Sequence, residues 1–163
     1  MRQLTYDEID ALWREKADME PEEAPYLVER MGQQQPYVVS YLLATGNEIL
    51  IPSEREVVFY MGVLIWYVID SLKITVPEIS VDQLMEIENK NYQMLEYLAG
   101  EPDSEFMETV GKIMDHYNQS VLLRYVIEQI MEEPEKSIKI IDNHIGIMVI
   151  YLKTFIDCID FLL

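Results

Sequence analysis

The stretch EVVFYMGVLIWYVID, from Glu56 to Asp70, contains thirteen consecutive residues without a charge. A helix that crosses the hydrocarbon core of a bilayer needs about 20 apolar residues. Here charged residues lie close on both sides, such as Glu54 before the run and Lys73 after it. A shorter run that is apolar on all sides is typical of a helix surrounded by other protein. We therefore expect residues 53–72 to form the central buried helix of a soluble protein.

The composition fits one acidic globular domain. The chain has 163 residues, which suits a single domain, and 50% of them are apolar, which is enough for one hydrophobic core. The formal net charge is −18, from 30 acidic and 12 basic residues. Such a chain would repel a nucleic-acid backbone or an anionic membrane surface, so we expect neither as a partner. The charge suits a basic protein partner, or it serves only to keep the molecule soluble.

The cysteine content and the first residues bear on the cellular compartment. Cys158 is the single cysteine, so no internal disulfide can form, and a reducing compartment is compatible with the sequence. The first residues, MRQLTYDEIDALW, contain no apolar segment of the kind that a secretory signal requires. We therefore expect a cytoplasmic protein.

Helix start and stop signals recur along the chain, and no alternating strand pattern appears. Capping-box spacing occurs at Thr5–Glu8, Ser53–Glu56 and Ser80–Gln83, Pro36 suits a first helical turn, and Gly46 suits a helix end. We expect an all-α bundle of six or seven helices in a single domain that spans residues 1–163. The expected helical segments begin at residue 5 and cover about 22–31, 36–46, 53–72, 80–100, 104–131 and 135–163.

Two features leave the arrangement of these helices open. The sequence YVIDSL from Tyr67 is similar to YVIEQI from Tyr125, which would fit a solenoid-like stack of helical hairpins, although any core helix uses such residues. The segment 1–34 is rich in acid and has one apolar edge that includes Trp13. We expect this segment to pack on the core of its own chain, the alternative being contact with a partner subunit.

The last expected helix, residues 135–163, carries the most regular apolar pattern of the chain. Its apolar residues are spaced alternately by three and four positions, which defines a heptad seam that other helices must cover. Such a seam either packs on the core of its own chain or forms a homodimer interface. The candidate interface residues are Ile138, Ile141, Ile145, Met148, Leu152, Phe155, Ile159 and Leu162.

The sequence contains no motif that defines a catalytic or metal site. There is no glycine-rich phosphate loop, nucleophile elbow, HExxH sequence or paired-cysteine motif. One cysteine and two histidines nearly exclude a structural zinc site. The residues three positions before His116 and His144 are Ile113 and Ile141, so the Glu-x-x-His motif of di-iron bundles is also missing. We therefore expect neither a metal nor a cofactor.

The aromatic and methionine content suggests a pocket. The chain has 11 Tyr, 2 Trp and 10 Met. Tyr and Trp combine a large apolar body with one polar atom, and Met fills irregular gaps. Such a core can hold a pocket for a small apolar ligand, or it can be a plain core whose hydroxyl groups reach the surface. The candidate pocket residues are Tyr37, Tyr41, Tyr60, Trp66 and His144, the last at the edge of an apolar helix face.

These observations give three hypotheses for function. The first is a non-catalytic interaction protein that self-associates as a homodimer, based on the heptad seam, the acidic surface and the absence of catalytic motifs. The second is a regulatory domain that binds a small apolar ligand in the core rich in Tyr, Met and Trp. The third is an enzyme that uses carboxylate and histidine chemistry around Asp142 and His144.

Overall fold

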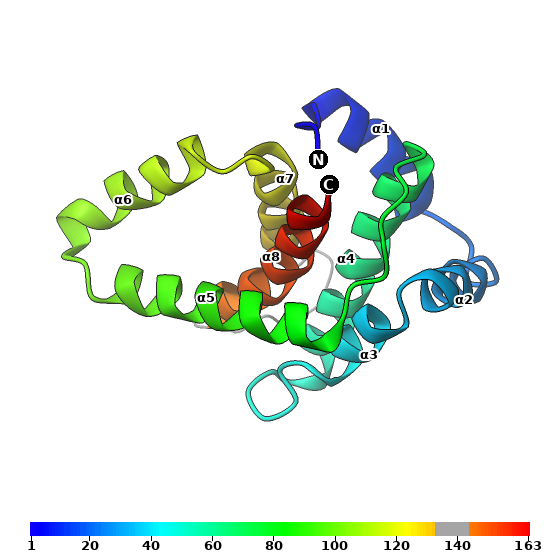
Figure 1. Ribbon diagram of the computed structural model, residues 1–163, viewed down its shortest axis with the longest axis horizontal. Helices are drawn as coiled ribbons and strands as arrows, with labels where there is room; N and C mark the ends of the chain where they lie inside the picture. The colour runs from blue at the N-terminus through cyan, green and yellow to red at the C-terminus, as the bar shows by residue number, and fades with distance from the viewer. Residues whose placement is uncertain (133–143) are drawn as a thin grey trace.

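The computed structural model describes residues 1–132 and 144–163, and over these residues it contains eight helices and no strand (Figure 1). The all-α fold class expected from the sequence is therefore confirmed. The helices are α1 (Tyr6–Ala17), α2 (Ala24–Gln34), α3 (Pro36–Ala44), α4 (Pro52–Ser71), α5 (Val81–Ala99), α6 (Asp103–Asp115), α7 (Ser120–Glu132) and α8 (Ile145–Leu162).

Helix α4 lies at the centre of the molecule and packs against α1, α2, α3 and α8. Between Val57 and Ile69, every residue is buried except Phe59, Tyr60 and Tyr67, which are half-buried. The long apolar run of the sequence is thus covered by protein on all sides. Among the residues that the structure describes, no helix combines the length and the apolar character needed to cross a membrane.

Helix α1 begins at the capping box expected from the sequence. The Thr5 hydroxyl accepts a hydrogen bond from the Glu8 N–H at 3.4 Å, and the Glu8 carboxylate accepts one from the Thr5 N–H at 3.0 Å. Arg2 donates to the same carboxylate at 2.6 Å, and this bond, together with those from Thr5, lowers the pKa of Glu8 to about 2. The helix then buries Ile9 and Trp13, and it packs on α4.

The starts of α4 and α5 differ in their chemistry. The expected capping box between Ser80 and Gln83 is confirmed at the start of α5. The one expected at Ser53 is wrong, because the N-cap residue of α4 is Ile51, two positions earlier, and its side chain cannot cap. Pro52 occupies the first helical position, where its fixed φ favours the helix and its missing N–H removes no hydrogen bond.

The single helix expected over residues 104–131 is wrong, since the chain forms α6 and α7 there, and the described residues thus hold eight helices rather than the six or seven expected. Side chains in the intervening turn bind the two ends of the chain. Asn118 Nδ2 donates to the Met1 carbonyl at 2.8 Å and to Asp160 Oδ1 at 2.7 Å, and Gln119 Nε2 donates to the same Asp160 oxygen at 3.0 Å. The turn is therefore stabilised by contacts that are distant in sequence.

Contacts between distant helices close the molecule. Helix α1 packs against α7, and Tyr125 Oη donates to Asp10 Oδ1 at 2.9 Å. In Figure 1, α5 and α6 form an arm that leaves the body and returns to it through α7. In a solenoid each hairpin contacts only its neighbours. The solenoid-like arrangement of hairpins that the sequence left open is therefore not the one observed.

Helix α4 ends in a turn whose backbone conformation normally favours glycine. Lys73 has a φ of 59°. Its N–H donates to the Asp70 carbonyl at 3.0 Å, and the Ile74 N–H donates to the Ile69 carbonyl at 3.4 Å, which is the Schellman pattern. An L-residue in this left-handed region costs about 1–2 kcal/mol. After α3, by contrast, the left-handed position is occupied by Gly46, with a φ of 72°.

We expect Lys73→Gly to raise the free energy of unfolding by about 0.5–1 kcal/mol, because glycine removes the left-handed penalty but gives the unfolded chain more freedom. Urea denaturation measures this change. The opposite substitution at the other left-handed position, Gly46→Ala, should lower the free energy of unfolding, since a Cβ at position 46 would lie 2.7 Å from Leu50 Cδ1. A less stable Lys73→Gly variant would contradict the left-handed conformation at position 73.

Candidate functional site

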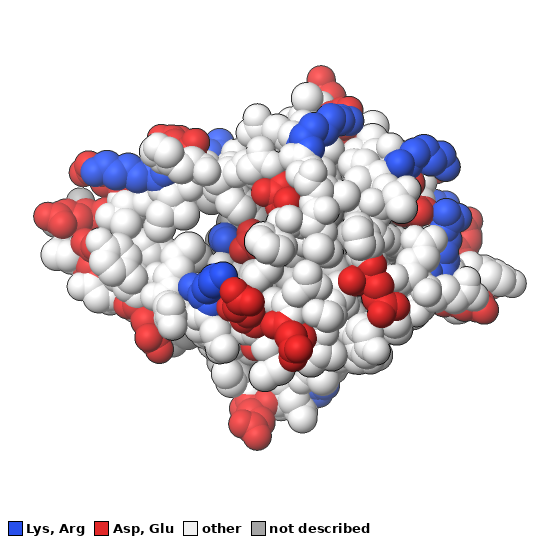
Figure 2. Space-filling model, in the orientation of Figure 1, with Lys and Arg blue, Asp and Glu red and all other residues white. Residues whose placement is uncertain are grey.

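An apolar cavity of about 160 Å³ lies between α5, α6, α7 and α8, and the surface that it exposes is wholly apolar. Figure 2 shows the molecule hollowed at this place, between the arm formed by α5 and α6 and the rest of the body. The lining residues are Met94, Leu95 and Leu98 from α5, Val110, Ile113 and Met114 from α6, Leu123 and Ile127 from α7, and Gly146, Val149, Ile150 and Lys153 from α8.

Each helix presents residues of one face to this cavity. Within each of the four helices, the outermost lining residues are separated by four or seven positions, which is one or two helical turns. Each set therefore lies on one side of its helix. Gly146, on α8, is the one glycine among these lining residues and adds no side chain to the wall. A Cβ built there would lie 3.7 Å from Leu95 Cδ1, which is ordinary van der Waals contact. The absent side chain at position 146 thus contributes space to the cavity.

A buried polar cluster joins α5 to α8 where Lys153 reaches the cavity. The Lys153 ammonium donates to Asn91 Oδ1 at 2.9 Å and to Asp157 Oδ2 at 2.6 Å. Asn91 Nδ2 donates to the same Asp157 oxygen at 2.9 Å and to Thr154 Oγ1 at 3.1 Å. Asn91, Lys153 and Thr154 are all buried. Since a buried charge needs a close partner, these contacts compensate the burial of the Lys153 ammonium.

Tyr117 completes the cluster from the turn between α6 and α7. Its hydroxyl donates to Asp157 Oδ1 at 2.6 Å, and the Lys153 ammonium lies 4.6 Å from the centre of its ring. Burial, and then the negative charge of Asp157, raise the pKa of the Tyr117 hydroxyl far above its usual value. Tyr117 therefore stays protonated and donates a hydrogen bond to the carboxylate at neutral pH.

A second set of hydroxyl groups lies between α3, α5 and α8. Tyr92 Oη donates to Tyr151 Oη at 2.7 Å, and Tyr41 Oη donates to Glu88 Oε1 at 2.9 Å. The rings of Tyr41 and Tyr92 both meet the Tyr151 ring edge-on, with centroids 6.4 Å and 6.2 Å apart. Burial, followed by the charge of Glu88, raises the pKa of Tyr41 well above its usual value. This cluster is a packed, hydrogen-bonded wall rather than an opening.

The residues expected to form a pocket point to different neighbours. Tyr41 faces α5, whereas Tyr60 Oη donates to the carbonyl of Ala17 at the end of α1 at 2.9 Å. Tyr37 is 44% exposed, and Trp66 is buried with no acceptor for its Nε1 among the described residues. Four cavities and grooves in the described part of the chain are lined by other residues. The structure therefore does not bring these four aromatic side chains together around one cavity.

His144 forms a pair with a carboxylate that lies far from it in the sequence. His144 Nδ1 lies 2.7 Å from Glu54 Oε2 and 3.1 Å from Glu54 Oε1, and the Glu54 side chain is 0% exposed. Ninety positions separate the two residues, so no local pattern could link them. Asp142, the other residue of the enzyme hypothesis, lies outside the described residues.

The heptad seam of the last helix is largely covered within one chain. Helix α8 packs against α4, α5 and α7. Of the eight candidate interface residues, Met148, Leu152, Phe155 and Ile159 are fully buried, and Ile145 and Leu162 are half-buried. Ile138 and Ile141 lie outside the described residues. A dimer could use the four buried residues only if the domain opened.

Reactive groups and metal ligands do not gather at the cavity. Within residues 1–132 and 144–163, no group of three or more His, Cys, Asp or Glu side chains could hold a metal ion. Cys158 is buried, and burial raises the pKa of its thiol to about 12, so the reactive thiolate is not formed at neutral pH.

Comparison of the chain with protein-family models, with curated proteins and with solved structures found no match. A functional assignment therefore depends on the geometry of the described residues alone.

We expect Lys153→Met to lower the free energy of unfolding by about 3 kcal/mol, because the half-buried Asp157 carboxylate loses its cation while methionine keeps much of the apolar stem. Chemical denaturation measures the loss. Adding Asp157→Asn removes the unpaired charge, so the double variant should recover part of the stability. If the single variant is as stable as the wild type, the ion pair is not buried in solution.

Proposed function

We propose that this protein binds a small, uncharged, apolar molecule in the cavity between α5, α6, α7 and α8. The observation that carries this proposal is the chemistry of the cavity wall, which is wholly apolar on the side that faces the space. The sequence also suggested binding of a small apolar ligand as one hypothesis, but with a different set of residues in the site.

The polar cluster beside the cavity supports an uncharged ligand. An ammonium group has three donors, and Lys153 has two oxygen acceptors and one aromatic face around it. Both Asp157 oxygens also accept hydrogen bonds from within the chain. A ligand carboxylate would therefore find no unpaired cation, and it would lose its own hydration on entering an apolar space. Selectivity would favour hydrocarbon over charged ligands of equal size.

The volume of the cavity limits the size of the ligand. Pockets for drug-sized molecules usually have about 300–1,000 Å³, whereas an engineered apolar cavity of about 150 Å³ in another protein binds benzene. The cavity here, at about 160 Å³, belongs to the smaller class. The cavity is partly open to solvent, so a ligand that fills it takes the apolar wall out of contact with water. A ligand that fills this space should therefore stabilise the fold.

The sequence-based preference for a self-associating interaction protein has less support from this geometry. It depended mainly on an apolar seam, and the described part of that seam is mostly buried within the chain. A basic protein partner remains a prediction, based on the net charge alone.

Thermal unfolding with toluene and with benzoate tests the proposal, since the two molecules differ in charge rather than in size. Toluene at 100 times its dissociation constant should add about 2.7 kcal/mol of stability, and each kcal/mol raises the Tm by about 2–4 °C at this chain length. Benzoate at the same concentration should leave the Tm unchanged. An equal response to both molecules, or no response to either, would overturn the proposal.

Two matched glycine substitutions locate the binding. Gly146→Met places a flexible side chain in the cavity, so the toluene effect should disappear. Gly111→Met makes the same change on α6 at an exposed position with nothing within 4 Å of the added Cβ, so it should leave the effect intact. If toluene stabilises both variants equally, it binds elsewhere.

A further inference from the structure

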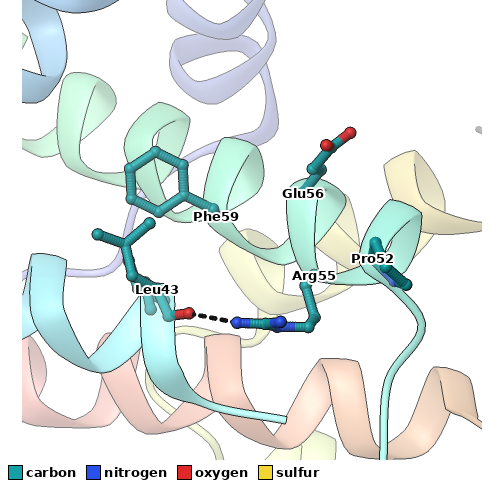
Figure 3. Close-up of a pocket in the computed structure, with 6 residues that line it drawn as sticks. Leu43, Pro52, Arg55, Glu56 and Phe59 are labelled. Carbon is teal, nitrogen blue, oxygen red and sulfur yellow. Dashed lines mark hydrogen bonds between the residues drawn. The ribbon is translucent and has the colours of Figure 1, made fainter. Parts of the chain in front are cut away.

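A groove with a volume of about 300 Å³ lies where the end of α3 meets the first turns of α4 (Figure 3). Pro52, Arg55, Glu56 and Phe59 lie at positions i, i+3, i+4 and i+7 of α4, so they share one face of that helix. The last turn of α3 supplies the apolar side, including Leu43, which is 53% exposed. The groove thus combines exposed apolar surface with one positive and one negative side chain.

The arginine of this groove has no carboxylate partner among the described residues of its own chain. One Arg55 guanidinium nitrogen, Nη2, donates to the Leu43 carbonyl at 2.9 Å, as Figure 3 shows, and Arg55 Nε, which is buried, has no acceptor among the described residues. Glu56 stands at the opposite rim and is exposed. Over the described ranges 1–132 and 144–163, neither residue takes part in an ion pair. The chain has 30 acidic residues, so a cation on its surface has many possible partners.

We propose that this groove is a self-association surface, on which a second copy of the chain docks with two-fold symmetry. In a two-fold interface, residue i of one subunit meets residue j of the other, and the reverse contact forms as well. Arg55 then faces Glu56 of the partner subunit, and Glu56 faces the partner subunit's Arg55. The exposed Leu43 and the half-buried Phe59 of each copy add apolar contact beside the two ion pairs.

The second copy is the occupant that these charges favour. A partner for this groove needs an acidic and a basic side chain beside apolar surface, and the same groove on another copy supplies all three. A strongly basic partner would satisfy Glu56 but would oppose Arg55, and a purely acidic partner would do the reverse. The pairing does not depend on the ligand-binding cavity, which is formed by other helices.

Sedimentation velocity over a range of protein concentrations, at about 0.15 M salt, tests the inference. At this ionic strength the Debye length is about 8 Å, so the net charge of each copy is largely screened while contact pairs persist. The wild-type chain should form a dimer. Arg55→Glu alone and Glu56→Arg alone should each raise the dimer dissociation constant at least about tenfold, because each sets like charges opposite each other.

Mixing the two variants is the decisive measurement. An Arg55→Glu chain opposite a Glu56→Arg chain restores both attractive pairs, so the mixture should form a dimer although each variant alone does not. This recovery cannot arise from damage to the fold of either variant. Arg124→Glu makes the same charge change at an exposed position on α7 and should leave the dimer unchanged. A monomeric wild type, a dimer unaffected by either variant, or a mixture without a dimer would overturn the proposal.

Discussion

The burial of α4 and α8 is the constraint on which the rest of the structure depends. Both helices are apolar around most of their circumference, and burial of each large apolar side chain yields about 1.5–3 kcal/mol. Only other helices can cover such surfaces. Helices α1, α2 and α3 cover α4, α5 and α7 cover α8, and the two central helices cover each other. The remaining helices need only one apolar face each, which matches the sequences of all of them except α3, where Tyr37 and Leu43 leave apolar surface exposed.

The polar cluster between α5 and α8 gives this apolar packing a defined register. Leucine and isoleucine side chains tolerate small shifts of one helix along another, but the hydrogen bonds of Asn91 to Thr154 and Asp157 do not. A shift of one turn would leave several buried polar groups unpaired, at about 1–3 kcal/mol each. The same fixed register holds Gly146 opposite Leu95, so the shape of the cavity depends on polar contacts that lie outside it.

Much of the fold could be predicted from the sequence, because local signals determine it. The apolar run 57–69 and the capping boxes at Thr5 and Ser80 locate helices from residues a few positions apart. The turn between α6 and α7 could not be predicted, since the hydrogen bonds of Asn118 that stabilise it are to Met1 and Asp160, which are distant in sequence.

The cavity could not be predicted for a related reason. Nothing in the sequence indicates that Gly146, which has no side chain, lies opposite three other helices. The pairing of His144 with Glu54 could not be predicted either, because only the tertiary fold brings the two residues together.

The contacts that close the molecule also have a consequence for the rate at which it folds. Helical proteins usually fold fast, because most of their contacts join residues close in sequence. Here the first residues bind the turn before α7 across 117 positions, and Asp10 binds Tyr125 across 115. The chain must close these long loops before α1 and α7 can stabilise each other, and loop closure carries an entropic cost. The protein thus combines the secondary structure of a fast-folding bundle with the chain topology of a slower one.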